Sequence, residues 1–267
     1  MARKKIGLAL GSGGVRGMAH VGIIKQLVKN NIPIDYIAGS SIGAWVGAHF
    51  ALFQDVEKLE LYTLGKKREK MRALFETAFL KGGLIGGAKI EKLLGTWFEN
   101  KTFKDCRIPF CAVATNLKTG ASVNFKKGNI AKAVRASMSV PTFFSPTEYD
   151  DMLLVDGGVS NPVPDDIVRK MGADVVISVN LDNFLKNSQF RSNGLIANAT
   201  RSLDITRYYL SKNSMKDSDI ILEPYTPVVG FLGFSEYFRK TDCEKRIMQN
   251  GERELKRHLA EIKDLID

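Results

Sequence analysis

Histidine and cysteine, the residues that most often bind metal ions or activate a nucleophile, are scarce in this sequence. There are three of each in 267 residues. The cysteines, Cys106, Cys111 and Cys243, are odd in number and form no C-x-x-C pair. This argues against a disulfide framework or a zinc site and fits a reducing compartment. Because no cluster of acidic residues resembles a calcium site, we expect neither a metal nor a cofactor.

Long apolar runs, repeats and low-complexity tracts are also missing. No run reaches the roughly eighteen apolar residues that are needed to span a bilayer. The first ten residues, MARKKIGLAL, are basic and then apolar, but glycines follow at once, so the apolar run is too short for a signal peptide. We therefore expect a cytoplasmic protein. We find no domain boundary and expect a single domain over residues 1–267.

Acidic residues are too few to balance the basic ones. The 39 lysines and arginines exceed the 29 aspartates and glutamates and give a net charge of +10. Such a surface favours anionic partners, including the inner face of an anionic membrane. The most basic run, residues 66–72, has no interleaved aromatic residues and no nucleic-acid-binding motif beside it, so we do not expect nucleic acid as a partner.

The pattern of short apolar runs and amphipathic segments predicts an α/β fold. Strand, helix, strand and helix follow one another over the first 53 residues, which indicates a mainly parallel sheet with right-handed crossovers. Residues 55–100 are expected to be mainly helical. The expected strands are 5–10, 34–39, 108–117, 121–125 as a hairpin partner, 152–156, 173–181 and 219–224, and the other expected helices are 15–30, 42–53, 130–138, 193–216 and 242–266.

The stretch LALGSGGVRG, residues 8–17, stands between a predicted strand and a predicted helix, where a nucleotide-binding loop would stand. The residues do not fit the dinucleotide-binding motif G-x-G-x-x-G, because Arg16 occupies the position of its last glycine. The G-K-[ST] of a P-loop is also missing after this stretch. Asp35 opens the second predicted strand, whereas a ribose-binding acid would end it. The evidence for a nucleotide site is therefore weak.

A second motif, GSSIG at residues 39–43, matches G-x-S-x-G with Ser41 at its centre. It also stands between a strand and a helix, the setting in which a serine is held on a sharp turn with its hydroxyl exposed. Flanking glycines suit such a crowded turn. The motif alone is equally compatible with a structural turn whose serine caps the next helix.

A nucleophilic serine needs a base, and the three histidines are poorly placed for that role. His20 and His49 lie within predicted helices, and His258 lies in the charged C-terminal helix, so we expect ordinary core or surface residues. Asp156 ends the apolar strand MLLV and opens D-G-G, a position typical of α/β active sites, although it could also simply start a turn. A base role would require a partly dry site that raises its pKa from about 3.9.

Taken together, SGGVRG, GSSIG and DGG in this order resemble the patatin-like phospholipase family. The resemblance covers roughly residues 5–225 and includes RGMAHVGIIKQL, ASMSVPTFFSP and GADVVISVNL. The resemblance implies a three-layer α/β/α fold and a Ser–Asp dyad without histidine. The family often has three successive glycines in the first motif, and here Ser12 replaces the first of them.

The resemblance assigns Ser41 as nucleophile, Asp156 as base and the amides around Gly13 and Gly14 as the oxyanion hole. Arg16 would hold the loop by hydrogen bonds or meet a phosphate, and we favour the structural role. The motif residues expected to support the site are Ser12, Arg16, Gly17, Gly39, Gly43, Gly157 and Gly158.

The expected activity is hydrolysis of phospholipids, lysophospholipids or other fatty-acyl esters through an acyl-serine. A thioesterase or acyltransferase with the same dyad, and a non-catalytic module that senses an acyl chain or a nucleotide, stay open as alternatives. The sequence does not fix the oligomeric state. Residues 228–238 are apolar and aromatic and could be a lid, a membrane or dimer contact, or core.

Overall fold

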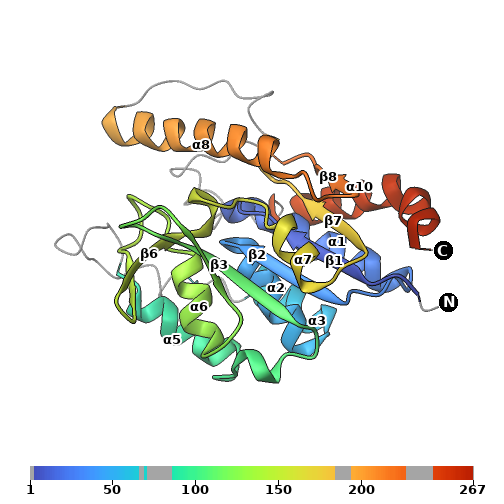
Figure 1. Cartoon of the computed structure of the whole chain (residues 1–267), viewed down its shortest axis with the longest axis horizontal. Helices are drawn as coiled ribbons and strands as arrows, with labels where there is room; N and C mark the ends of the chain where they lie inside the picture. The colour runs from blue at the N-terminus through green and yellow to red at the C-terminus, as the bar shows by residue number, and fades with distance from the viewer. Residues whose placement is uncertain (1–2, 66–68, 71–85, 184–193, 227–242, 267) are drawn as a thin grey trace.

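A mixed eight-stranded sheet forms the centre of the computed structural model, which describes residues 3–65, 69–70, 86–183, 194–226 and 243–266 (Figure 1). The strand order is β5-β6-β3-β2-β1-β7-β8, with β4 also paired to β3. Strands β3, β2, β1, β7 and β8 are parallel, whereas β4 and β6 run antiparallel to β3, and β5 runs antiparallel to β6. The strands are β1 Ile6–Leu10, β2 Tyr36–Ser40, β3 Phe110–Asn116, β4 Ser122–Phe125, β5 Thr147–Tyr149, β6 Met152–Asp156, β7 Val175–Val179 and β8 Ile220–Leu222.

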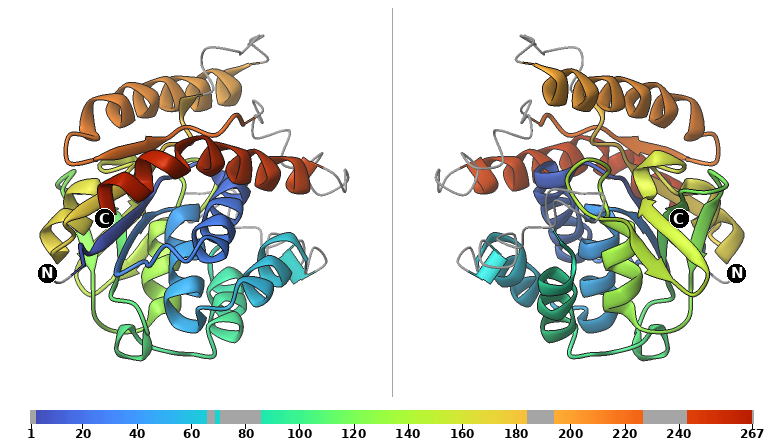
Figure 2. Two further views of the ribbon diagram at one scale, coloured as in Figure 1. Left: turned by 90° about the vertical axis from the view of Figure 1, so that its right-hand side faces the viewer. Right: turned by 90° about the vertical axis from the view of Figure 1, so that its left-hand side faces the viewer.

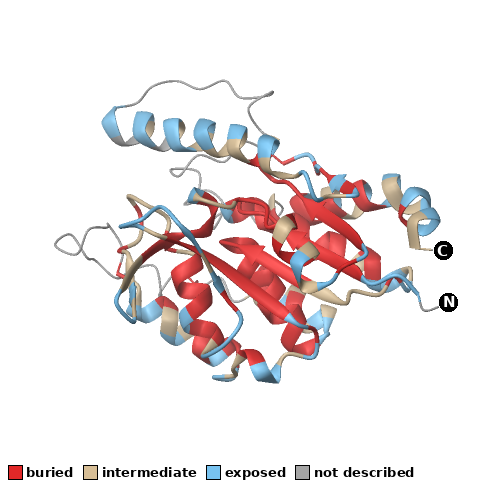
Figure 3. Cartoon of the chain, in the orientation of Figure 1, coloured by how far each residue is buried: buried red, intermediate tan, exposed pale blue. Residues whose placement is uncertain are grey.

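Helices cover both faces of the sheet, so the α/β prediction is confirmed. One face packs on α1, α2, α6 and α10, and the other packs on α7 (Figure 2). Strands β1, β7 and most of β2 and β3 are buried because both of their faces are covered, which explains their nearly continuous apolar sequences (Figure 3). The helices are α1 Met18–Lys29, α2 Ile42–Phe53, α3 Val56–Leu64, α5 Ala88–Trp97, α6 Ile130–Ser137, α7 Asp165–Met171, α8 Leu195–Ser214 and α10 Cys243–Ile266.

Most predicted elements occur within a few residues of their expected bounds, including the β3–β4 hairpin. The predicted helix 15–30 begins instead with a short 3-10 turn, Gly14–Gly17, before α1. The aromatic segment 228–238 and most of the basic run 66–72 lie outside the described residues.

The direction of β6 differs from that of the parallel strands at the centre of the sheet. In the β3–β6 pair, Asp156 lies opposite Ala114, and in the β2–β3 pair, Ser40 lies opposite Val113. β3 extends beyond the end of β2, and β6 pairs with this extension. The C-terminal residue of β6 therefore arrives beside the carboxyl end of β2, although the two strands run in opposite directions.

Candidate active site

Ser41 occupies a strained turn between β2 and α2. Its backbone has φ 56° and ψ −122°, a conformation that residues with a side chain rarely adopt. A Cβ on Gly39 would collide with the carbonyl oxygen of Gly43, and a Cβ on Gly43 would collide with that of Leu10. Both glycines of the predicted G-x-S-x-G elbow are thus required by close backbone contacts. Ser41 stands at the N-cap position of α2, but its side chain makes no capping hydrogen bond, so its hydroxyl does not serve to cap the helix.

The hydroxyl of Ser41 contacts Asp156, which lies 115 residues away in the sequence. Ser41 Oγ donates a hydrogen bond to Asp156 Oδ2 at 2.5 Å, and each of the two residues is only 5% exposed. The other carboxylate oxygen, Oδ1, accepts a hydrogen bond from the amide of Gly158 at 2.8 Å. The structure therefore brings together the serine and the acid that the sequence singled out.

Burial raises the pKa of Asp156 to about 6, from 3.8. The hydrogen bonds from Ser41 and Gly158 and the positive charge of Arg207 act in the opposite direction, because they stabilise the ionised carboxylate. A carboxylate with a pKa near neutrality is a far better proton acceptor than a free aspartate. The partly dry site that the sequence analysis required is present.

The end of α6 braces both members of this pair. The amide of Ser41 donates to Ser137 Oγ at 2.8 Å, and the amide of Asp156 donates to the carbonyl oxygen of Ser139 at 2.9 Å. Arg135 fixes this segment by donating to Ser139 Oγ at 2.6 Å and to the Ser145 carbonyl at 3.0 Å. Ser137 was not among the predicted site residues, because nothing in its spacing from Ser41 marks it as a partner.

The two glycines after Asp156 serve close packing. A Cβ on Gly157 would collide with the Val113 carbonyl oxygen, and a Cβ on Gly158 would lie 2.8 Å from Ser12 Oγ and 3.0 Å from Asp156 Oδ1. Neither residue has a positive φ. These glycines begin the 3-10 turn Gly157–Val159, and their lack of a side chain lets the glycine-rich loop and β3 approach the acid.

The described residues leave two amides of the glycine-rich loop without a hydrogen-bond partner. The amide of Gly11 donates to Val179 O at 3.0 Å, and that of Ser12 donates to Pro162 O at 2.8 Å. Within the part of the chain that the structure describes, the amides of Gly13 and Gly14 have no hydrogen-bond partner. They precede α1, and the exposed Gly14 has φ 57°. Two such amides at a helix start suit an anion.

Gly17 and Arg16 fix the loop in place. A Cβ on Gly17 would collide with the side chain of Ile42, the residue after Ser41, so the loop packs directly on the elbow. Arg16 is buried and donates to Gly13 O at 3.1 Å and Leu181 O at 2.9 Å. Burial lowers the pKa of Arg16 to about 10, which leaves it charged at neutral pH. These contacts support the structural role that the sequence analysis favoured.

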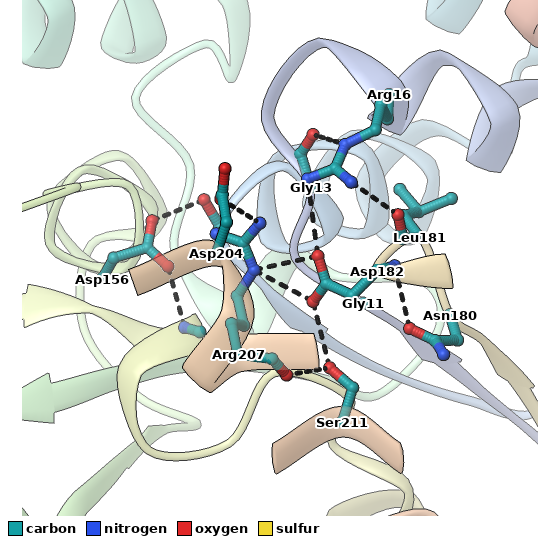
Figure 4. Close-up of polar contacts among 12 residues, drawn as sticks. Gly11, Gly13, Arg16, Asp156, Asn180, Leu181, Asp182, Asp204, Arg207 and Ser211 are labelled. Atoms are coloured by element: carbon teal, nitrogen blue, oxygen red, sulfur yellow. Dashed lines mark hydrogen bonds and ion pairs between the residues drawn. The ribbon is translucent and has the colours of Figure 1, made fainter. Parts of the chain in front are cut away.

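Asp182 links this loop to α8 (Figure 4). Its carboxylate pairs with Arg16 at 3.4 Å and with Nε of Arg207 at 2.9 Å, and it accepts a hydrogen bond from Ser211 Oγ at 3.0 Å. Arg207 also pairs with Asp204 at 3.1 Å. The sequence analysis missed this network. Asp182 directly follows a predicted strand, but no local pattern pointed to Arg207.

Among the described residues, neither the histidines nor Asp35 has a hydrogen bond to Ser41 or Asp156. His20 hydrogen-bonds Gly11 O at 2.8 Å, and the ring of His49 packs against Phe53. Burial lowers the pKa of both to about 4. His258 hydrogen-bonds a surface glutamate. Asp35 precedes β2 and pairs with Arg3 at the surface.

Among the described residues, no group of three or more His, Cys, Asp or Glu side chains could hold a metal ion. In the same residues, no helix has the length and apolar character that crossing a membrane requires.

The chain is similar to known proteins in sequence and in fold. The sequence profile of the family described as "Patatin-like phospholipase" matches residues 8–168. An uncharacterised NTE family protein of Mycobacterium tuberculosis is 34% identical over 178 residues, which are 67% of this chain and 49% of the relative. Patatin-like phospholipase domain-containing protein 7 of Mus musculus is 32% identical over 181 residues, which are 66% of this chain and 13% of the relative.

Each match thus spans about half or less of the curated relative's length. Among solved structures, VipD from Legionella pneumophila has a TM-score of 0.71 at 13% identity, covering 97% of this chain and 67% of VipD. At that identity the likeness concerns the fold.

Proposed function

The chain belongs to the patatin-like phospholipase family, whose members are lipid hydrolases, and we propose that it hydrolyses fatty-acyl esters of phospholipids or lysophospholipids. Ser41 is the nucleophile and Asp156 is the base. The observation that carries this proposal is the 2.5 Å hydrogen bond between Ser41 Oγ and Asp156 Oδ2, two residues that are each only 5% exposed to solvent. A pair of this kind is what a serine nucleophile requires in place of histidine.

In the first step, Ser41 Oγ attacks the ester carbonyl carbon while its proton passes to Asp156 Oδ2. The negative oxygen of the tetrahedral intermediate is held by the amides of Gly13 and Gly14, which have no hydrogen-bond partner among the residues that the structure describes. The intermediate collapses, the C–O bond breaks, and the leaving alcohol takes the proton from Asp156. Loss of one oxyanion donor typically costs a factor of about 100 to 1,000 in rate.

In the second step, Asp156 takes a proton from water, and the resulting hydroxide attacks the acyl-serine. The second intermediate collapses to a fatty acid, and Ser41 Oγ recovers its proton from Asp156. Arg16 contributes by holding the carbonyl of Gly13, and thereby the loop, while Asp182 holds Arg16. Positioned backbone donors of this kind need no reorganisation during the reaction.

The test is a serine-directed fluorophosphonate probe combined with Ser41→Ala. We expect the probe to label Ser41 in the wild type, and Ser41→Ala to lose at least about 1,000-fold in turnover of a short p-nitrophenyl ester while staying folded. Ser202→Ala, which removes an exposed hydroxyl on α8, is the matched control and should keep wild-type activity and labelling. Wild-type turnover by Ser41→Ala, or labelling of a different serine, would contradict the assignment.

A further inference from the structure

Helix α8 has a surface composition that is unusual for a solvent-exposed helix. Among the residues of α8 whose exposure the structure describes, ten are exposed, and Lys212 is the only charged one of these. Four are large apolar or aromatic residues: Leu195 at 86%, Tyr209 at 58%, Leu203 at 42% and Ile205 at 39% exposure. The exposed residues of α8 are Leu195, Asn198, Ala199, Ser202, Leu203, Ile205, Thr206, Tyr209, Lys212 and Asn213.

Helix α10 of the same chain shows what a solvated helix looks like here. It also has ten exposed residues, and eight of them are charged, six basic and two acidic. Both helices lie at the outside of the molecule (Figures 2 and 3). The outer face of α8, defined by its ten exposed residues and carrying a single charge at Lys212, therefore differs locally from the rest of the chain, which is rich in charge.

The inner side of α8 is held by polar contacts close to the candidate dyad. The single acidic residue of α8, Asp204, is bonded to Arg207, and Arg207 and Ser211 both bond the buried Asp182. The positive charge of Arg207 acts on Asp156. The helix therefore presents apolar side chains outward while it is tied inward to the residues around Ser41.

We propose that the outer face of α8 docks this protein on an anionic phospholipid surface. This inference rests on the proposed function, because a hydrolase of membrane phospholipids meets its substrate at a lipid surface. Apolar and tyrosine side chains enter the headgroup region favourably, and the absence of exposed acids on α8 removes repulsion from anionic lipids.

The charge of the chain favours this occupant over a second copy. The net charge is +10, and the exposed residues of α10 are mainly basic. If two copies associated, their positive charges would repel each other. An anionic bilayer instead attracts the basic residues of one copy, with a binding free energy of about 1 kcal/mol for each basic residue near the surface.

The experiment is co-sedimentation with vesicles of phosphatidylcholine containing about 30% phosphatidylglycerol, compared with vesicles of phosphatidylcholine alone. We expect the wild type to bind the anionic vesicles, and the double variant Ile205→Glu/Tyr209→Glu to bind about tenfold less or worse. Ala260→Glu, which adds a negative charge at an exposed position of α10, is the matched control and should lose much less. All three proteins should hydrolyse a soluble p-nitrophenyl ester at the same rate.

The single substitution Tyr209→Trp adds a tryptophan fluorescence signal on the outer face of α8. Its emission should shift to the blue with anionic vesicles, since both natural tryptophans, Trp45 and Trp97, are buried. The docking proposal is overturned if the wild type does not bind anionic vesicles, or if the double variant binds them equally well. It is also overturned if the wild type is a dimer and the double variant loses dimerisation but keeps vesicle binding, since the face would then be a dimer contact. If vesicles bind but the soluble ester is not hydrolysed, the proposed function fails and the docking surface stands.

Discussion

The pH dependence of the esterase reaction tests the environment that the structure gives Asp156. The reaction needs this carboxylate in its ionised form, and burial raises its pKa to about 6. With that pKa, about 9% of the free enzyme is active at pH 5 and about 91% at pH 7, so kcat/KM should rise about tenfold. With the ordinary aspartate pKa of 3.8, the same interval would change kcat/KM by less than about a tenth.

The assay is kcat/KM for a soluble p-nitrophenyl ester between pH 4.5 and 8, because this parameter reports the ionisation of the free enzyme. Arg207→Gln adds a directional test. The positive charge of Arg207 lowers the pKa of Asp156, so its removal should move the midpoint to higher pH. Arg257→Gln is the matched control, since the Arg257 side chain is 74% exposed on α10 and should leave the midpoint unchanged. A flat profile from pH 5 to pH 7 would refute the reasoning.

Three further substitutions test the remaining contacts. Asp156→Asn should abolish activity. Because the pKa of Asp156 is raised in the fold, wild-type stability should fall as this carboxyl ionises, so the free energy of unfolding of Asp156→Asn relative to wild type should rise by about 2 kcal/mol between pH 4 and pH 7.5. Urea titrations of both proteins at the two pH values would contradict this if the difference between them stayed constant. Asp182→Asn should lower the free energy of unfolding by about 3 kcal/mol or more, since it leaves Arg16 and Arg207 without their shared carboxylate. A denaturant unfolding midpoint close to that of the wild type would argue against this role of Asp182. Ser12→Ala should leave activity intact and should leave the free energy of unfolding unchanged or raise it by up to about 1 kcal/mol, because Ser12 Oγ is buried without a hydrogen-bond partner among the described residues. A clear loss of kcat would show that the Ser12 hydroxyl takes part in the reaction.

Local signals explain how much of the fold and site could be predicted. The β1–α1 and β2–α2 units follow from apolar runs and helical periodicity within short windows, and the elbow at Ser41 follows from two glycines whose contacts are made within a few residues or with the adjacent strand. Elimination of the three histidines also needed only sequence, because each lies inside a predicted helix.

The parts that could not be predicted depend on contacts between distant segments. Ser137 and Ser41 are 96 residues apart, and Asp182 and Arg207 meet only because α8 folds back over the loop that follows β7. Motif spacing carries no information on such pairings. The spacing also did not reveal that β6 runs antiparallel to β3, because strand direction depends on how the chain returns to the sheet.

The sequence by itself determined the α/β fold class, the family resemblance and the two residues that we propose as a dyad, because each is encoded in short, contiguous patterns. Only the tertiary structure decided that Ser41 Oγ and Asp156 Oδ2 share a hydrogen bond and that burial raises the pKa of Asp156. It also decided that, among the described residues, the amides of Gly13 and Gly14 have no hydrogen-bond partner, whereas the amide of Ser12 has one. Burial and hydrogen bonding are properties of the packed chain, since they depend on which distant groups exclude water from a side chain or satisfy its donors.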